Sequence, residues 1–190
     1  MELSVQLYLG LLVLVAVGRL LELRRSRNNQ ARLLAAGGEK SPEPRYPWMV
    51  ALHVSILAGA ALEAVFLRRP WIPAFGSVAI TFFFAANATR WWVIRTLGPR
   101  WNVQVVSPAL GVIAAGPYRY VRHPNYTAVF VEMLALPLIH SAWIVAFAGS
   151  LAHIFVLRHR VALEESVLRR DPTWQAAFQH RPRFLPWTAS

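Results

Sequence analysis

The chain has 190 residues, of which 56% are hydrophobic and only 15% charged, and its formal net charge at pH 7 is +11. Soluble domains usually carry about 25% charged residues, so the composition indicates an integral membrane protein. Such a positive charge would suit a nucleic-acid-binding protein, but here the basic residues flank apolar runs, as at the cytoplasmic face of membrane proteins. Nucleic acid is therefore not an expected partner. Without cysteine, disulfides, thiolate metal sites and a cysteine nucleophile are excluded.

The apolar runs predict about five membrane segments. Three runs are long enough to cross about 30 Å of hydrocarbon: Leu3 to Leu23, Trp48 to Leu67, and Ile72 to about Ile94. The fourth run, Thr127 to Leu157, is too long for one span and too short for two full ones. Pro137 and the pair His140–Ser141 interrupt it, so we expect a hairpin of two short helices.

The remaining segments are polar or amphipathic. Residues 28–47 contain two glycines and three prolines, which predicts a partly irregular linker. The stretch from Arg158 to His180 fits an amphipathic helix at the membrane surface, broken at Asp171-Pro172. No stretch alternates like a strand. We therefore predict an all-α, integral membrane helical bundle: one domain over residues 1–190, with three transmembrane helices in 1–95 and a second half in 96–190.

The positions of the basic residues predict how the bundle is oriented in the membrane. The stretches 24–45, 90–122 and 158–183 hold six, five and six Lys or Arg residues. Five membrane segments put all three stretches on one side, whereas an even number would put the last one opposite. The positive-inside rule makes that side cytoplasmic, so the N-terminus is expected outside and the C-terminus in the cytoplasm.

Three ionisable residues fall inside the predicted segments: Glu63, Glu132 and His140. Charged groups in hydrocarbon are costly, so such residues either pair with a neighbouring helix or serve a function. The sequence leaves both interpretations open for each of them.

The densest polar and aromatic cluster is residues 116–126. Pro124 favours a helix that starts at or after His123, which would leave free N–H groups suited to an anionic ligand group such as a carboxylate. Tyr118 and Tyr126 offer flat faces for an adenine or a cation. The alternative is an ordinary interfacial belt of tyrosine and arginine.

A second cluster contains Arg160 and Glu164, which are four residues apart and therefore share one helix face. It lies just beyond the predicted hairpin. Because a hairpin returns the chain to where it entered, these two residues are expected over His123 and Tyr126. The alternative is a surface ion pair without function.

Together the clusters read Gly-Pro-Tyr-x-Tyr-x-Arg-His-Pro-x-Tyr and, after the hairpin, Arg-x-x-x-Glu-Glu-x-x-Leu. This order resembles the isoprenylcysteine carboxyl methyltransferase family, of a bacterial type, and phospholipid methyltransferases share parts of it. The resemblance spans about Arg90 to Pro186. It implies a membrane-embedded enzyme that uses S-adenosylmethionine, binds it on the cytoplasmic side and takes a lipid-like substrate from the bilayer, without a metal.

The resemblance also implies roles for single residues. Arg160 and Glu164 would be the catalytic pair, with Arg160 facing the substrate. The cofactor-binding residues would be Leu110, Gly111, Val112, Ile113, Tyr118, His123, Pro124, Asn125, Tyr126 and Glu164. For a hydroxyl acceptor, Glu164 or His123 would take the proton. After the Glu-Glu pair, family members often have Phe-Gly and two tyrosines. This chain has Asp171-Pro172 there, followed by Trp174 and Phe178, so its closing helix is expected to pack differently.

These features predict an O-methyltransferase that acts on the carboxylate or hydroxyl of a lipophilic substrate in a bacterial inner membrane. The substrate would be an isoprenoid or resemble an alkylpyrone, because Arg45-Tyr46-Pro47 resembles bacterial members associated with alkylpyrone-type polyketides. A phospholipid amine stays open. One rival is a membrane reductase of the sterol-reductase type, which would bind a nicotinamide cofactor. The other is a non-catalytic membrane protein, which would bind no cofactor.

Overall fold

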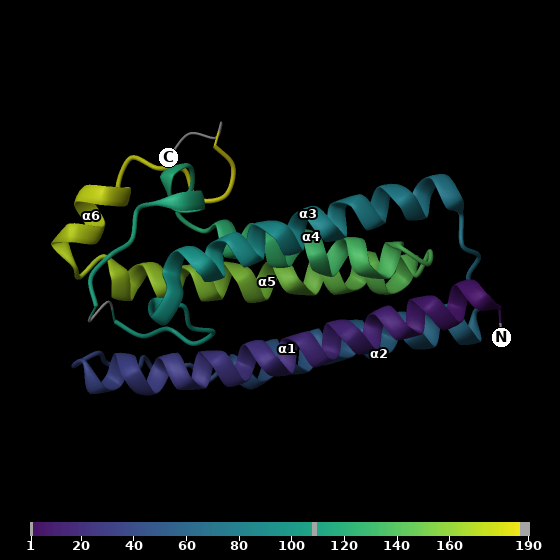
Figure 1. Ribbon diagram of the computed structural model, residues 1–190, viewed down its shortest axis with the longest axis horizontal. Coiled ribbons are helices and arrows are strands. Elements are labelled where there is room, and N and C mark those ends of the chain that lie inside the picture. The colour runs from purple at the N-terminus through teal and green to yellow at the C-terminus, as the bar shows by residue number, and fades with distance from the viewer. Residues whose placement is uncertain (1, 108–109, 187–190) are drawn as a thin grey trace.

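The computed structural model describes residues 2–107 and 110–186, and every regular element within these ranges is helical. Six α-helices follow one another along the chain (Figure 1). Their bounds are α1 (Leu3–Ala35), α2 (Tyr46–Phe66), α3 (Pro73–Leu97), α4 (Pro124–Leu138), α5 (Trp143–Leu168) and α6 (Pro172–Phe178). Two 3-10 turns, η1 (Gly98–Arg100) and η2 (Gly116–Arg119), lie between α3 and α4. The predicted all-α fold is confirmed for this part of the chain.

The five long helices lie side by side along the long axis of the molecule, and α6 lies beyond one end of them (Figure 1). That end contains the last turns of α1, α3 and α5 and the start of α2. The N-terminus and the connection between α2 and α3 lie at the opposite end. The three basic stretches, 24–45, 90–122 and 158–183, thus gather at one end of the bundle, as an odd number of antiparallel segments predicts.

Three described helices, α1, α2 and α5, are long and apolar enough to cross a membrane. Large apolar side chains such as Leu14, Phe66 and Phe155 are exposed on their outer faces, where a soluble protein would carry polar groups. In contrast, α4 has only 15 residues, and α3 carries Arg90 and Arg95 in its last third. The predicted count of five spanning segments therefore stays a prediction.

The first helix is longer than the apolar run that predicted it. It continues through Ala35, so within the linker predicted over residues 28–47 only residues 36–45 lie outside a helix, and the prediction of a partly irregular linker is confirmed. Buried contacts hold the extension in place. The Asn29 side chain donates a hydrogen bond of 2.7 Å to the carbonyl of Trp101, and Leu33 is buried. The helix ends at Ala35, and just beyond it Gly37 adopts a φ of +88°, which suits a residue without a Cβ.

The predicted hairpin is present. Helix α4 ends at Leu138 and α5 begins at Trp143, and Pro137 lies in the last turn of α4. Beyond the hairpin, residues 158–168 continue α5, so the separate surface helix expected from residue 158 was wrong in its first half. The break falls where it was predicted, because Asp171 caps α6 by accepting a hydrogen bond from the Thr173 N–H at 2.8 Å. Hydrogen bonds from the Thr173 hydroxyl and N–H groups lower the pKa of the Asp171 carboxyl.

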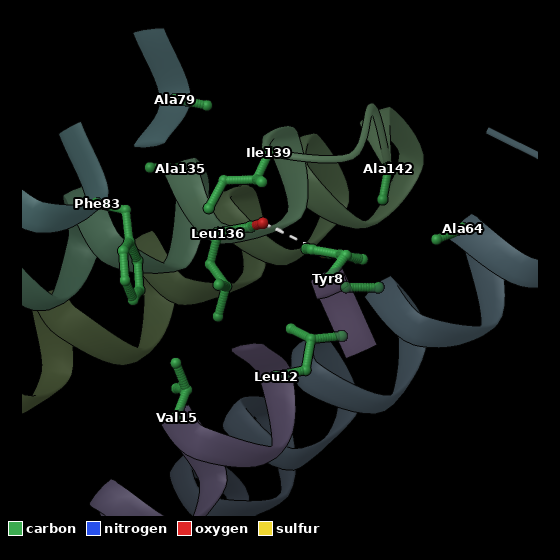
Figure 2. Packing of buried hydrophobic residues seen from close by; sticks show 11 residues of the cluster. Tyr8, Leu12, Val15, Ala64, Ala79, Phe83, Ala135, Leu136, Ile139 and Ala142 are labelled. Carbon is green, nitrogen blue, oxygen red and sulfur yellow. Dashed lines mark hydrogen bonds between the residues drawn. The ribbon is translucent and has the colours of Figure 1, made fainter. Parts of the chain in front are cut away.

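A hydrophobic cluster joins the helices in the half of the bundle away from the basic end (Figure 2). It is built from Tyr8, Leu12, Val15, Ala60, Ala64, Ala79, Phe83, Ala135, Leu136, Ile139 and Ala142. Tyr8 donates a hydrogen bond of 3.2 Å to the carbonyl of Leu136. Many of these side chains are alanine, and small residues let membrane helices approach closely.

Two of the three ionisable residues predicted inside spans pair with neighbouring helices in this half. Glu63 accepts hydrogen bonds from the Ile144 and Val145 N–H groups at 3.1 and 2.8 Å, so it caps the start of α5. His140 stacks on Tyr8 and lies 3.3 Å from the Ser4 hydroxyl. These contacts favour the structural interpretation for both residues.

Candidate active site

A cavity of about 490 Å³ lies inside the bundle and reaches its basic end. All five long helices, loop residues 101–107 and 110–113, and α6 contribute to its walls. Small-molecule sites commonly have volumes of about 300–1,000 Å³. Most of the residues predicted for the site line this one cavity: Leu110, Gly111, Val112, Ile113, Tyr118, His123, Asn125, Tyr126, Arg160 and Glu164. Pro124 is not among the lining residues; its place is at the first position of α4.

The two sequence clusters meet at the cavity wall, as the hairpin predicted. The hydroxyl of Tyr126 on α4 donates a hydrogen bond to the carboxylate of Glu164 on α5. The Nδ1 atom of His123 lies 3.9 Å from the same carboxylate. Glu164 keeps about a third of its side chain exposed, so it presents a negative charge to the cavity.

Tyr118 lies beside this carboxylate. Burial, with the charge of Glu164 as a smaller cause, raises the pKa of the Tyr118 phenol well above its ordinary value. Its hydroxyl therefore stays neutral at physiological pH. The ring packs edge-on against Phe178 of α6 at 6.3 Å, so α6 closes this part of the cavity.

Glu165, the second acid of the Glu-Glu pair, has a different role from that of Glu164. It is buried and lies 3.0 Å from Nε2 of His123. It also accepts hydrogen bonds from Arg169 at 2.9 Å and from Arg183 at 2.8 and 3.0 Å. Glu165 therefore fixes the His123 ring and joins α5 to the C-terminal tail. The sequence interpretation assigned no role to Glu165, although the motif contained it.

The start of α4 is held by the tail. The Arg122 and His123 N–H groups donate to the carbonyls of Pro182 and Arg183, each at 2.9 Å. His123 then precedes Pro124 with an extended φ of −126°, and α4 begins without a side-chain cap. The helix thus starts where the Pro124 position predicted, but neither His123 nor Asn125, which the sequence offered as caps, caps the N–H groups of its first turn.

Arg160 is buried and already paired. Its Nη1 donates to the carboxylate of Glu43, and its Nη2 donates to the carbonyl of Val103 at 2.5 Å. Glu43 comes from the loop between α1 and α2 and also accepts from the Val105 N–H at 2.5 Å. Sequence reasoning missed Glu43, because an acid among the prolines of a linker belongs to no helical periodicity and to no motif.

The linker and the loop of residues 101–107 support each other. The Ser41 N–H donates to the carbonyl of Val105, and the Ser107 N–H donates to the carbonyl of Glu39, both at 3.0 Å. Further along, Gly111 adopts a φ of +78°, and the Arg100 side chain donates a hydrogen bond of 2.9 Å to the carbonyl of Leu110. These contacts hold the backbone of residues 110–113 against the cavity.

A second polar layer lies deeper in the cavity, between the helices. Arg19 on α1 donates to Glu22 at 2.5 Å and to Glu132 on α4 at 2.6 Å. Arg90 on α3 donates to Glu22 at 2.6 Å and lies 3.5 Å from the Asn125 amide oxygen. These two arginines and two glutamates, called the inner ionic layer below, all line the cavity. The sequence indicated Glu132 as notable, but not its partner, which lies 113 residues away.

Comparison with known proteins places this site in a family. Residues 78–170 match the sequence model of the isoprenylcysteine carboxyl methyltransferase (ICMT) family. This region of the chain is similar to that family. The ICMT match includes both motifs, so the family recognised from them is confirmed, and it implies a membrane methyltransferase.

Two bacterial proteins resemble a larger part of the chain than the ICMT region. An uncharacterized protein of Bacillus subtilis (strain 168), YpbQ, is 26% identical over 164 residues, which cover 84% of this chain and 95% of that protein. An uncharacterized protein of Haemophilus influenzae is 24% identical over 152 residues, which cover 79% and 88%. The likeness therefore extends beyond residues 78–170 into the flanking helices.

Proposed function

We propose that this protein is an integral-membrane, S-adenosylmethionine-dependent O-methyltransferase that acts on the carboxylate or hydroxyl of a lipophilic substrate, such as an isoprenoid or an alkylpyrone-like compound. The observation that carries the proposal is the contact between Tyr126 and Glu164 at the cavity wall. It joins the two motifs of the ICMT region in one site, and the cavity continues from there into an apolar interior.

The residues at the basic end fit the functional groups of the proposed cofactor. S-adenosylmethionine carries an ammonium group, a carboxylate, ribose hydroxyls and an adenine. Glu164 offers a carboxylate to the ammonium group or to hydroxyls, and the uncapped start of α4 offers N–H groups to a carboxylate. Tyr118 and the backbone of residues 110–113 complete this wall. His123, Asn125 and Tyr126 are the further cofactor residues of the proposal, whereas Pro124 acts through the helix start.

When bound, S-adenosylmethionine supplies a methyl group that is already activated, so the protein has to align donor and acceptor and exclude water. The cofactor would give this methyl group to an acceptor oxygen and keep the electron pair of the broken C–S bond on its sulfur, and with a hydroxyl acceptor Glu164 or His123 would take the proton. Arg160 and Glu164 flank the space where an acceptor would meet the cofactor and form the proposed catalytic pair. The contacts of Arg160 with Glu43 and Val103 fix its guanidinium in this place.

The proposal includes a location. The protein would form one membrane domain in a bacterial inner membrane, with five spanning segments and its N-terminus outside. The first three helices would lie in residues 1–95 and the catalytic half in 96–190. The site and the C-terminus would face the cytoplasm. The gathering of the three basic stretches at the site's end supports this orientation. The substrate would enter from the bilayer.

Binding of S-adenosylmethionine to the protein in lipid nanodiscs, measured by calorimetry, tests the proposal. We expect saturable binding that Glu164→Ala abolishes and Glu39→Ala leaves unchanged, because Glu39 is exposed and lies outside the cavity. Absence of binding to folded wild-type protein would overturn the proposal. Binding of a nicotinamide cofactor instead would favour the reductase, and binding of neither would favour a non-catalytic protein.

A further inference from the structure

One carboxylate oxygen at the cavity lacks a hydrogen-bond donor among the described residues. Oε1 of Glu132 accepts from Arg19 at 2.6 Å, whereas Oε2 is buried and has no hydrogen-bond partner among the described residues. The side chain of Glu132 is only 1% exposed, and it lines the cavity. A buried carboxylate oxygen without a donor is costly, so this position is suited to a ligand that brings one.

A second unpartnered group lies beside this carboxylate. Within the described residues, Nε of Arg19 also has no hydrogen-bond partner, and Arg19 is the residue that pairs with Glu132. Both side chains line the cavity, so Arg19 offers a donor and Glu132 an acceptor at one point of its wall. This set matches a group that both donates and accepts, which a hydroxyl does and a carboxylate does not.

The surroundings of these polar groups are apolar. The side chains that line the cavity also include Leu20, Val54, Val129, Met133, Val156 and Leu157. A ligand that reaches the inner ionic layer therefore needs a long hydrocarbon part and a small polar group.

Charge distinguishes a carboxylate from a hydroxyl as the polar group that the substrate could bring to the inner ionic layer. The inner ionic layer holds two arginines and two glutamates, so it is neutral as it stands. A carboxylate would add an unbalanced negative charge next to Oε2 of Glu132, inside a region of low dielectric constant. The cation that could receive a carboxylate at the other end of the cavity, Arg160, is already paired with Glu43. A neutral hydroxyl meets neither obstacle.

We propose that Glu132 and Arg19 form a hydroxyl-binding subsite, and that the substrate is an uncharged long-chain compound with a free hydroxyl group rather than a carboxylic acid. The substrate assignment rests on the proposed function, whereas the subsite does not. Glu132 acts here as a recognition residue, which accepts the hydrogen bond of the hydroxyl and repels anions.

Three ligands of equal chain length separate charge from shape: 4-octylphenol, 4-octylbenzoate and 4-octylbenzamide. At pH 7 the phenol and the amide are neutral, and the benzoate is ionised. Binding is measured by equilibrium dialysis against the protein in nanodiscs without any methyl donor, and empty nanodiscs correct for partitioning. We expect the phenol and the amide to bind about tenfold more tightly than the benzoate.

Variants locate the selectivity. Glu132→Gln should reduce the preference for phenol over benzoate to less than about threefold, mainly by strengthening benzoate binding. Glu63→Gln is the matched control, because Glu63 is also a buried helix glutamate but lies outside the cavity, and it should keep the wild-type preference. If Glu132→Gln fails to fold because Arg19 loses its partner, the double variant Arg19→Gln/Glu132→Gln removes the pair together.

Equal or tighter binding of the benzoate to the wild type would overturn the inference, and so would an unchanged preference in a folded Glu132 variant. The amide makes the wild-type measurement sufficient by itself. The amide and the benzoate have similar shapes and differ in charge, so a site that selects by shape alone would bind them equally well. Failure of S-adenosylmethionine binding would refute the proposed function and leave this selectivity standing, so the two failures are distinguishable.

Discussion

Arg160 and Glu43 are 117 residues apart in the chain, yet their side chains pair directly at the cavity wall. One belongs to the ICMT region, and the other comes from the linker between the first two helices. The proposed catalytic arginine therefore depends on the N-terminal half for its position. This gives the linker a part in the site that no motif indicates.

The first prediction concerns Glu43→Gln. The substitution removes the charge that holds Arg160, while the Val103 carbonyl keeps one of its contacts. We expect the rate of methyl transfer to fall by up to about 100-fold, because small displacements of an aligning group cost that much. The affinity for S-adenosylmethionine should change little, which calorimetry checks beside initial rates. Glu39→Ala, in the same linker, should keep the wild-type rate; an equal loss there would point to a general disturbance of the loop.

The second prediction distinguishes the adjacent acids Glu164 and Glu165. Glu165→Gln weakens the hydrogen bonds to His123, Arg169 and Arg183, so thermal unfolding in detergent should occur at lower temperature. The two arginines are half exposed, so the expected loss is only about 1–3 kcal/mol. Glu164→Gln should leave the unfolding temperature nearly unchanged and weaken cofactor binding instead. The reverse pattern would exchange the roles assigned to the two acids.

The third prediction concerns pH. Burial raises the pKa of Tyr118 above that of an unfolded tyrosine, which is about 10. The folded state thus holds the phenolic proton more tightly, and its contribution to stability is complete below pH 10 and is lost as the pH rises further. Unfolding midpoints measured from pH 8 to 11 should fall above pH 10, and the fall should be smaller in Tyr118→Phe. An identical fall in the variant would show that Tyr118 is not the group responsible.

The fourth prediction concerns packing between α2 and α5. A Cβ on Gly149 would lie 2.8 Å from Cγ1 of Ile56, closer than side chains tolerate. Gly149→Ala should therefore destabilise the protein by about 1–3 kcal/mol. Gly10→Ala serves as the control, because Gly10 is also helical and has open space around it; there the change should be neutral or stabilising. Thermal unfolding of the two variants, measured together, decides.

Sequence patterns predicted the parts of the fold that local chemistry determines. Pro137 and the adjoining polar pair indicated the hairpin, and Asp171-Pro172 indicated the break before α6. The hairpin in turn brought Glu164 to Tyr126, because two antiparallel helices with a short turn leave little choice of partners. These inferences needed only periodicity and helix-breaking residues.

The missed features depend on contacts between elements far apart in the chain. Periodicity indicates which face of a helix is buried, but not which helix lies against it, so the partner of Glu132 was not predictable. The extension of α1 to Ala35 depends on Asn29 meeting the loop after α3, and the regular structure described in that loop is limited to the short turns η1 and η2. The contact of Glu43 with Arg160 belongs to the same class.

The hydrogen bonds from residues 122–123 to Pro182 and Arg183 have a consequence for biosynthesis. His123 leaves the ribosome 60 residues before Arg183, so the hairpin can enter the membrane while the start of α4 still lacks these partners. The cofactor wall becomes complete only when the tail returns to it. A nascent chain that ends before residue 182 would thus carry both motifs and an unfinished site, which keeps the proposed methyltransferase inactive until its synthesis has passed that point.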